Sequence, residues 1–405
     1  MSAFLDALRA RRIALAYRLP RWWNRALAGA LIVVGILLPF FFPADSGFMN
    51  GTIIAVTFAV MSLGLNIVVG FAGLLDLGYV AFYALGAYCL GWFGSGFFFK
   101  LHIHVLVSPV ASTLAGVHLN FVLILIAAVL ICSAAGILIG LPTLRLRGDY
   151  IAIVTLAFGE IIGTLAVNGQ SISVGGGMTL TAGNLGISAV DAPYFPGYGS
   201  FGLLNLRPWY WLIFGILLLV LFVNLRLRDS RLGRAWVALR EDEVAAVSMG
   251  VPLVKTKLLA YSVGAAFGGM AGAFFGTYYT VVNASQFAFG FSIFILAMVI
   301  IGGIGSIWGA LVGGLALGYI NNYLIPDVLN NLPSHFGLHF QLTQLGVGIF
   351  GFLLVIMMLL RPQGLIPERR RQLELTAQIA AEDAQLEEAP AGQVTMILPP
   401  GEGAA

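Results

Sequence analysis

Two carboxylic acids lie inside long apolar stretches of this chain. Asp76 is found in GFAGLLDLGYVAF and Glu160 in TLAFGEII. A charge at the centre of a membrane-spanning helix costs about 2.5–3.5 kcal/mol on insertion scales, so such residues usually line a polar cavity or meet a partner. We expect Asp76 near a helix end, where it reaches water or acts as an interfacial residue or cap. Glu160 falls in mid-span and must face a polar cavity, pair with a partner or be protonated. Both are therefore candidate pathway or gating residues.

Other reactive side chains form no catalytic or metal-binding pattern. His102 and His104 form an HxH motif with His118 nearby, but no carboxylate or cysteine supports them, so we interpret them as ordinary loop residues. Cys89 and Cys132 lie in apolar stretches and are interpreted as small core residues. No lysine follows a glycine-rich phosphate loop. The sequence therefore predicts no metal site and no ATP hydrolysis by that route.

Composition predicts an all-α integral membrane protein. Of 405 residues, 59% are hydrophobic and 10% charged, and the mean hydropathy is +0.94. The basic N-terminal stretch lacks a small-residue cleavage site, so we expect the first apolar span to be retained. Hydropathy predicts ten membrane-spanning segments. They are 26–42, 51–70, 78–99, 119–141, 150–167, 209–223, 258–282, 291–301, 307–323 and 341–360.

Lysine and arginine predict the orientation of these segments. Nineteen of them fall in four stretches on one side: 1–25, 142–149, 224–257 and 361–405. Only Lys100 and Arg207 fall in the other connections. Because basic residues are enriched in cytoplasmic loops, we expect both termini in the cytoplasm. The segment 291–301 is short and runs into Gly302 and Gly303, so it either crosses fully or is re-entrant.

Three parts are expected along the chain. Residues 1–25 form a basic cytoplasmic segment, 26–367 the transmembrane domain, and 368–405 a disordered acidic tail. The connection 168–208, rich in Gly and Ser, is either flexible or a structured outer surface. The basic loop 224–257 is amphipathic and offers a docking surface, which we assign to an ATPase because the chain has no phosphate loop.

Glycines repeat every fourth residue in two of the predicted spans. They are Gly264, Gly268, Gly272 and Gly276 in one, and Gly305, Gly309 and Gly313 leading into the other. Four-residue spacing places them on one helix face, where helix backbones approach closely. We expect tight helix packing, and such smooth faces also permit sliding during a transport cycle.

Five sequence blocks resemble the permease subunits of ABC importers for branched-chain amino acids. The similarity is greatest to the M-type subunit, covers roughly residues 50–367, and keeps the family's order of blocks. The blocks are Gly64–Tyr88, Arg147–Ile161, Thr181–Ile187, Ile301–Gly314 and Arg361–Pro367. The order of the blocks is more specific than any one of them.

The resemblance implies a permease that pairs with a second, H-type permease in the bacterial inner membrane. It implies two cytoplasmic ABC ATPase subunits, which would hold ATP and Mg, and a periplasmic or surface amino-acid-binding protein. It implies no cofactor on this chain and no nucleic acid. Asp76 and Ala182 are departures, since the family usually has a small polar or apolar residue and a glycine there.

The resemblance also implies coupling through a loop with an E-A-A-x-x-x-G pattern. Ala245, Ala246 and Gly250 match this pattern, but Val244 stands at the glutamate position and Glu243 comes one residue earlier. We predict one helix, from residue 240 to residue 249, that ends at the glycine. The docking role is retained, while a contact through a single glutamate is in doubt.

Two classes of function remain. The first is a non-catalytic permease of an ABC importer for branched-chain amino acids, with urea or short-chain amides as alternative substrates. The second is a stand-alone secondary transporter, which needs ion-coupling groups and an internal repeat. Asp76 and Glu160 could supply the groups, but no repeat is evident. A membrane-embedded enzyme is disfavoured because no catalytic constellation is present.

Overall fold

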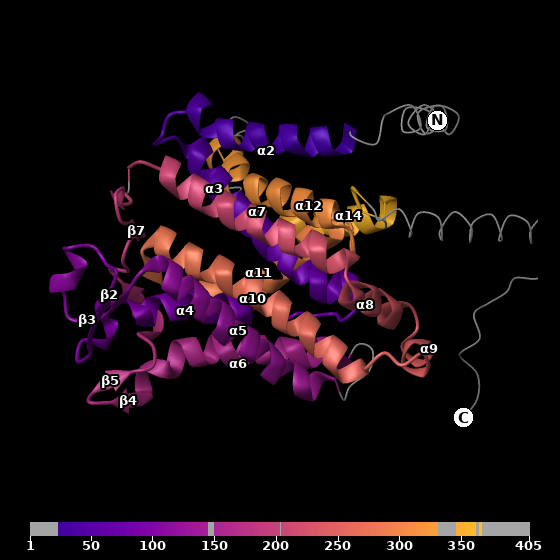
Figure 1. Cartoon of the computed structure of the whole chain (residues 1–405), viewed down its shortest axis with the longest axis horizontal. Coiled ribbons are helices and arrows are strands. Elements are labelled where there is room, and N and C mark those ends of the chain that lie inside the picture. The colour runs from indigo at the N-terminus through magenta and orange to yellow at the C-terminus, as the bar shows by residue number, and fades with distance from the viewer. Residues whose placement is uncertain (1–22, 145–149, 203, 331–345, 362–363, 367–405) are drawn as a thin grey trace, which may run out of the picture.

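The computed structural model describes residues 23–144, 150–202, 204–330, 346–361 and 364–366. Most of the expected N-terminal segment 1–25 and all of the acidic tail 368–405 lie outside these residues. The described chain is a bundle of long helices (Figure 1). Short strands lie at one end, hereafter the strand end, and α8 (Arg231–Glu241) and α9 (Glu243–Ser248) lie at the other.

Each of the ten predicted segments contains a helix. The helices are α2 (Trp23–Phe41), α3 (Gly47–Leu65) continued by the π-helix η1 (Asn66–Phe71), α4 (Val80–Phe93), α5 (Phe121–Thr143), α6 (Tyr150–Asn168), α7 (Arg207–Asp229), α10 (Leu253–Tyr279), α11 (Phe289–Gly302), α12 (Ile307–Tyr319) continued by η7 (Ile320–Leu329), and α14 (Gly346–Leu360). Five of the resulting spans are long and apolar enough to cross a membrane alone. The prediction of a mostly helical, multi-pass architecture is confirmed.

α4 and α11 are short because a break in the helical backbone precedes α4 and another follows α11. Each has 14 residues, so each is about 21 Å long, less than the roughly 30 Å of a hydrocarbon core. α11 ends at Gly302, and α12 begins after four intervening residues and returns along it. If Gly309 or Gly313 carried a Cβ atom, that atom would clash with backbone atoms of α11, so the two helices are in close contact. The predicted segment 291–301 is thus one arm of a hairpin that breaks at Gly303.

α3 lies at the centre of the bundle, and its most apolar window is fully buried. The glycines of α10 face it and α4. A Cβ on Gly264 would lie 2.5 Å from Val68 Cγ2, and one on Gly272 would overlap the Tyr83 carbonyl. Gly268 and Gly276 pack against α4 in the same way. These glycines bring backbones together because no side chain separates them.

Gly305 does not belong to the α12 face on which the sequence pattern placed it. It lies in the turn before the helix, with φ +83°. Glycine is favoured in this left-handed conformation because it lacks a Cβ. Ser306 is the N-cap of α12, and its hydroxyl accepts from Gly309 N at 3.1 Å. The four-residue spacing from Gly305 to Gly309 therefore crosses the start of α12, and only Gly309 and Gly313 lie on the helix face.

The strand end is a folded layer of short strands. β1 (Gly94–Ser95), β3 (Gly116–Leu119) and β2 (His102–Val105) form a three-stranded sheet in that order. Three further two-stranded sheets involve the connection 168–208. They pair β4 (Ser173–Gly175) with β5 (Met178–Thr179), β6 (Ile187–Ser188) with β9 (Val281–Val282), and β7 (Tyr194–Phe195) with β8 (Gly199–Ser200). The described residues of the connection 168–208 therefore form a structured surface rather than a flexible connection.

The loop between α7 and α10 holds two helices, so the prediction of one helix from residue 240 to residue 249 is wrong. The backbone of Asp242 is extended (φ −150°, ψ 109°), which ends α8. Its carboxylate then accepts from Val244 N and Ala245 N at 2.9 Å and caps α9. Aspartate is a favoured N-cap because it satisfies free backbone amides. Gly250, with φ +87°, lies just after α9.

Candidate functional site

α6 carries a polar stripe on its exposed face. Glu160, Thr164 and Asn168 are exposed and follow one another at four-residue spacing, so they lie one above the other. Ala157 continues this face toward the α8 end. Glu160 lies near the middle of the 19-residue helix. An exposed carboxylate at this depth needs water or a polar partner.

α5, the neighbour of α6, has an exposed face without polar side chains. Its exposed residues between positions 121 and 143 are Val122, Leu123, Ile126, Leu130, Ile131, Ala134, Ile137, Leu138, Leu141 and Pro142. The polar Ser133 is half-buried and pairs with Ser262 Oγ at 2.5 Å. Such an apolar face is suited to contact with lipid. α5 and α6 are equally exposed, and they differ in the polarity of their exposed faces.

Asp76 does not reach water, contrary to the expectation from its place in the sequence. It is 2% exposed and lies in the non-helical segment between η1 and α4. One carboxylate oxygen accepts from Gly78 N at 2.8 Å within this segment, but the N-cap of α4 is Tyr79, so Asp76 does not cap that helix. Its other oxygen, Oδ2, has no hydrogen-bond partner in the part of the chain that is described.

The structure does not bring Asp76 and Glu160 together. The segment that carries Asp76 packs on the buried face of α6, where Leu77 N donates to Thr155 Oγ1 at 3.0 Å. A Cβ on Gly78 would overlap the Thr155 carbonyl. Thr155 is buried and Glu160 is exposed. The segment of Asp76 therefore packs on one face of α6, and Glu160 projects from another.

The coupling residues predicted from the sequence divide into inward and outward groups. Glu243 Oε2 pairs with Lys257 Nζ at 2.7 Å, and the lysine side chain is only 7% exposed. Ala246 is buried as well, whereas Ala245 and Gly250 are exposed. Glu243 therefore ties α9 to α10, and Ala246 is covered, so neither of these two residues presents a free surface.

The outward face of α9 is apolar, which the motif did not indicate. Val244 is 76% exposed and Met249 86%, with Val247 also exposed between them. Exposed apolar side chains on a short helix at the end of the bundle suit a protein partner. The sequence did contain one indication of this apolar surface, because Val244 stands where the motif has a glutamate.

The interpretation of His118 as a loop residue without a carboxylate partner is wrong. It is buried in β3, and its Nδ1 lies 2.6 Å from Asp191 Oδ2. His104 stacks on it with ring centroids 5.4 Å apart. Burial raises the pKa of Asp191 above its usual 3.8, and His118 partly opposes this shift. Among the residues that the structure describes, no group of three or more metal-ligating side chains occurs, and His102 lies exposed in β2.

A helical bundle with five long apolar spans and two interrupted helices is the architecture of a multi-pass membrane protein. The chain belongs to the family described as "branched-chain amino acid transport system / permease component", whose model matches residues 47–359. As a permease component it is a transport subunit and not an enzyme.

Similar proteins come from bacteria and an archaeon. The high-affinity branched-chain amino acid transport system permease protein LivM of Escherichia coli K12 is 35% identical over 85% of this chain and 76% of its own length. A probable LivM of Methanocaldococcus jannaschii is 28% identical over 76% of this chain and 90% of its own length. LivH of Salmonella typhimurium is 27% identical over 66% of this chain and 82% of its own length. No solved structure matches the chain.

Proposed function

We propose that this chain is the M-type permease of an ATP-driven importer for branched-chain amino acids. It forms the translocation pathway together with a second, H-type permease. The polar stripe on the exposed face of α6, with Glu160 at its middle, carries this proposal. The second permease is supported by the fact that Escherichia coli K12 has both LivM and LivH, and both are similar to this chain.

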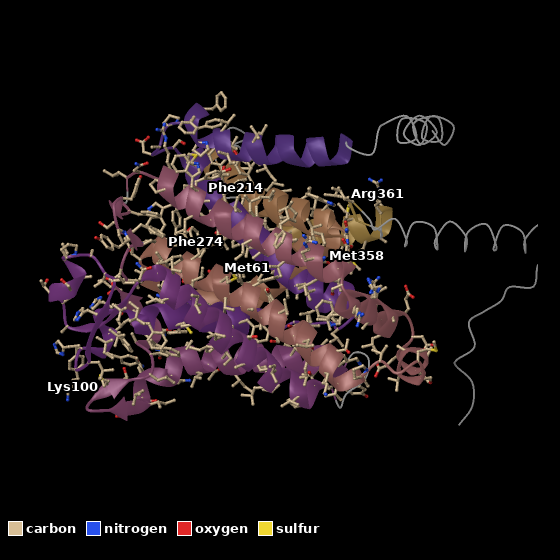
Figure 2. The ribbon with its side chains drawn as sticks, viewed as in Figure 1. Met61, Lys100, Phe214, Phe274, Met358 and Arg361 are labelled. Atoms are coloured by element: carbon tan, nitrogen blue, oxygen red, sulfur yellow. The ribbon has the colours of Figure 1, made fainter. Side chains whose placement is uncertain are left out.

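The α8 end of the bundle is proposed to face the cytoplasm of a bacterial inner membrane, with both termini on that side. Seven basic residues of the loop 224–257 are found there, and Arg361 lies at the same end, whereas Lys100 lies at the strand end (Figure 2). This distribution follows the positive-inside rule. A periplasmic binding protein would then deliver substrate to the layer of short strands.

Two ABC ATPase subunits are proposed to drive the cycle from the α8 end. One of them covers the exposed apolar face of α9, formed by Val244, Val247 and Met249. ATP and Mg are held by those subunits, and this chain needs no cofactor of its own. Movement of the ATPases reaches the membrane through α8 and α9.

Glu160 is proposed to line the pathway, and the buried Asp76 to act at a gate through the segment that carries it. A zwitterionic amino acid has no net charge, and its ammonium group is attracted by one carboxylate. An aliphatic side chain suits the apolar residues that otherwise form the helices. A pathway of this kind disfavours substrates with a net negative charge, such as glutamate.

Reconstituted vesicles test the assignment. Vesicles that hold this chain, an H-type permease, the ATPases and the binding protein should accumulate labelled leucine, isoleucine or valine only with ATP. Uptake of urea or acetamide in place of these amino acids would move the substrate to the amide class. Uptake by this chain alone, driven by an ion gradient and indifferent to ATP, would make it a secondary transporter.

A further inference from the structure

Two breaks in transmembrane helices lie next to each other near the α8 end. The first comprises η1 and the non-helical residues 72–79 before α4, with Gly73 at φ +69°. The second comprises residues 303–306 between α11 and α12, with Gly303 at φ +125°. Both interrupt the regular backbone hydrogen bonding, so the free groups must find other partners. Within the first break, Val80 N donates to Ser292 Oγ of α11 at 3.1 Å.

Asn66 joins the two breaks directly. It is fully buried at the start of η1, and its Oδ1 accepts from Gly305 N at 2.9 Å. Gly70 lies one turn further on, and a Cβ there would come within 2.7 Å of the same Gly305 nitrogen. A displacement of η1 therefore acts at once on the turn between α11 and α12.

Arg240, near the end of α8, contacts the first break. Its guanidinium donates to the carbonyl of Gly70, and its side-chain stem lies against Gly73, where a Cβ would come 2.7 Å from Arg240 Cγ. Carbonyls in the last turn of a helix lack intrahelical partners and carry the negative end of the helix dipole. A guanidinium is a suitable donor because it is always charged and forms strong hydrogen bonds.

α8 and α9 are also fixed to the first turns of α10. The buried Trp236 donates its indole N–H to the Thr256 carbonyl at 2.7 Å, and Glu243 pairs with Lys257. The two helices therefore have a firm support on α10 and a separate contact, through Arg240, with the first break. An ATPase that moves α8 and α9 displaces the first break through this arginine.

We propose that Arg240 is the positioning residue that makes α8 and the two helix breaks move as one unit. Movement passes from α8 through Gly70 to Asn66 and then to the Gly305 turn. This inference rests on the proposed function, since it concerns how ATP hydrolysis by a partner is converted into opening of the pathway. Without Arg240 the ATPases still bind and turn over, but the breaks no longer follow α8.

The test is the ratio of substrate uptake to ATP hydrolysis in reconstituted vesicles. Arg240→Gln removes the charged donor to the Gly70 carbonyl and should lower uptake per ATP about tenfold, which is equivalent to about 1.4 kcal/mol. ATP hydrolysis should stay near the wild-type rate. Arg240→Lys keeps a cationic donor and should be intermediate. Arg361→Gln is the matched control, because Arg361 is exposed at the same end of the bundle and lies outside the loop 224–257.

A double variant tests whether Asn66 acts in the same path. If the two residues act in series, the double variant Arg240→Gln with Asn66→Ala should have the same uptake per ATP as the more impaired of the two single variants. Amide hydrogen exchange of residues 66–79 should also be faster in Arg240→Gln, with or without substrate. This exchange measurement does not depend on which substrate is carried, and wild-type uptake in the same vesicles reports separately on the proposed function.

Three results would overturn the proposal. One is a normal ratio of uptake to hydrolysis in Arg240→Gln. Another is equal loss of uptake and hydrolysis in both Arg240 variants, which would make the residue part of ATPase docking. The third is unchanged exchange of residues 66–79, because the arginine would then not hold the first break.

Discussion

α5 and α6 are equally buried, yet their exposed faces differ in chemistry. In each helix 28% of the most apolar window is buried, and they lie side by side at the edge of the bundle (Figure 1). The exposed face of α5 has only apolar side chains, whereas that of α6 carries Glu160, Thr164 and Asn168. A carboxylate is unfavourable on a face that contacts lipid, because a charge in hydrocarbon is costly. The difference supports the proposal that α6 lines the pathway while α5 meets lipid.

The buried helix α3 completes the comparison. Its polar side chains are satisfied within the chain: Ser62 Oγ donates to the Ala310 carbonyl at 2.7 Å and Thr57 Oγ1 to the Ile53 carbonyl at 2.9 Å. Glycines on the neighbouring helices let these groups approach. The polar side chains of α3 are therefore structural, whereas Glu160, Thr164 and Asn168 of α6 are exposed, and we propose that they are available to substrate.

The largest effect is expected in the core, where no space remains. Gly272→Leu places a side chain against the Tyr83 carbonyl of α4. Overpacking usually costs about 1–3 kcal/mol, and a backbone clash more, so we expect at least about 3 kcal/mol of destabilisation. The folded fraction after detergent extraction measures it. Gly215→Leu on α7, where a Cβ meets nothing within 4 Å, should remain folded. Equal behaviour of the two variants would contradict the packing account.

Charges on α9 should abolish transport without loss of folded protein. Val244→Glu combined with Met249→Glu changes two exposed side chains, and hot-spot residues at the centre of an interface contribute about 2 kcal/mol or more each. We expect the ATPases to be lost on co-purification and uptake to fall at least about 100-fold. Val244→Leu with Met249→Leu is the apolar control. Retained ATPase in the charged variant would place the docking surface elsewhere.

Substitutions of Glu160 should impair transport more weakly and leave stability unchanged, because the side chain is exposed. Glu160→Gln keeps a polar group and should lower uptake about tenfold, the effect of one hydrogen bond to a charged group. Glu160→Leu should be worse. Uptake assays at matched amounts of folded protein measure both. If both variants transport like wild type, the α6 stripe has no role in the pathway.

The smallest effect is expected for Asp191, a carboxylate that is already paired within the chain. Burial raises its pKa above 3.8, so the folded protein binds a proton more tightly than the unfolded chain between 3.8 and the raised pKa. Wild-type stability should therefore increase, relative to Asp191→Asn, as pH falls through this window, and decrease as pH rises. Thermal unfolding in detergent from pH 7 to pH 4 measures the difference. A difference that moves in the opposite direction would contradict the assigned shift.

Local signals predicted most of the helices and little of the site. Apolarity and length found the ten segments because each is a property of one stretch of chain. Glycine spacing found the faces of α10 and α12, but not that Gly305 precedes its helix. Asp242 is a typical N-cap and could have shown the division between α8 and α9.

Contacts between distant residues could not be predicted. His118 and Asp191 are 73 positions apart, and Asn66 and Gly305 are 239 apart. The outward direction of Glu160 also required the fold, since helical position alone does not tell which face is covered. The sequence therefore predicted that Glu160 needs a polar environment, and the structure shows that its side chain lies on the exposed face of α6.

Thiol labelling of α6 and α5 tests most directly whether the exposed face of α6 lines an aqueous pathway. Ala157→Cys lies on the α6 stripe and Leu130→Cys on the exposed face of α5, at similar distances from the strand end. The native Cys89 and Cys132 are buried, which limits background reaction. In the assembled transporter, a membrane-impermeant methanethiosulfonate should modify Ala157→Cys, with protection by leucine, and leave Leu130→Cys intact. An Ala157→Cys variant as unreactive as Leu130→Cys would contradict the account.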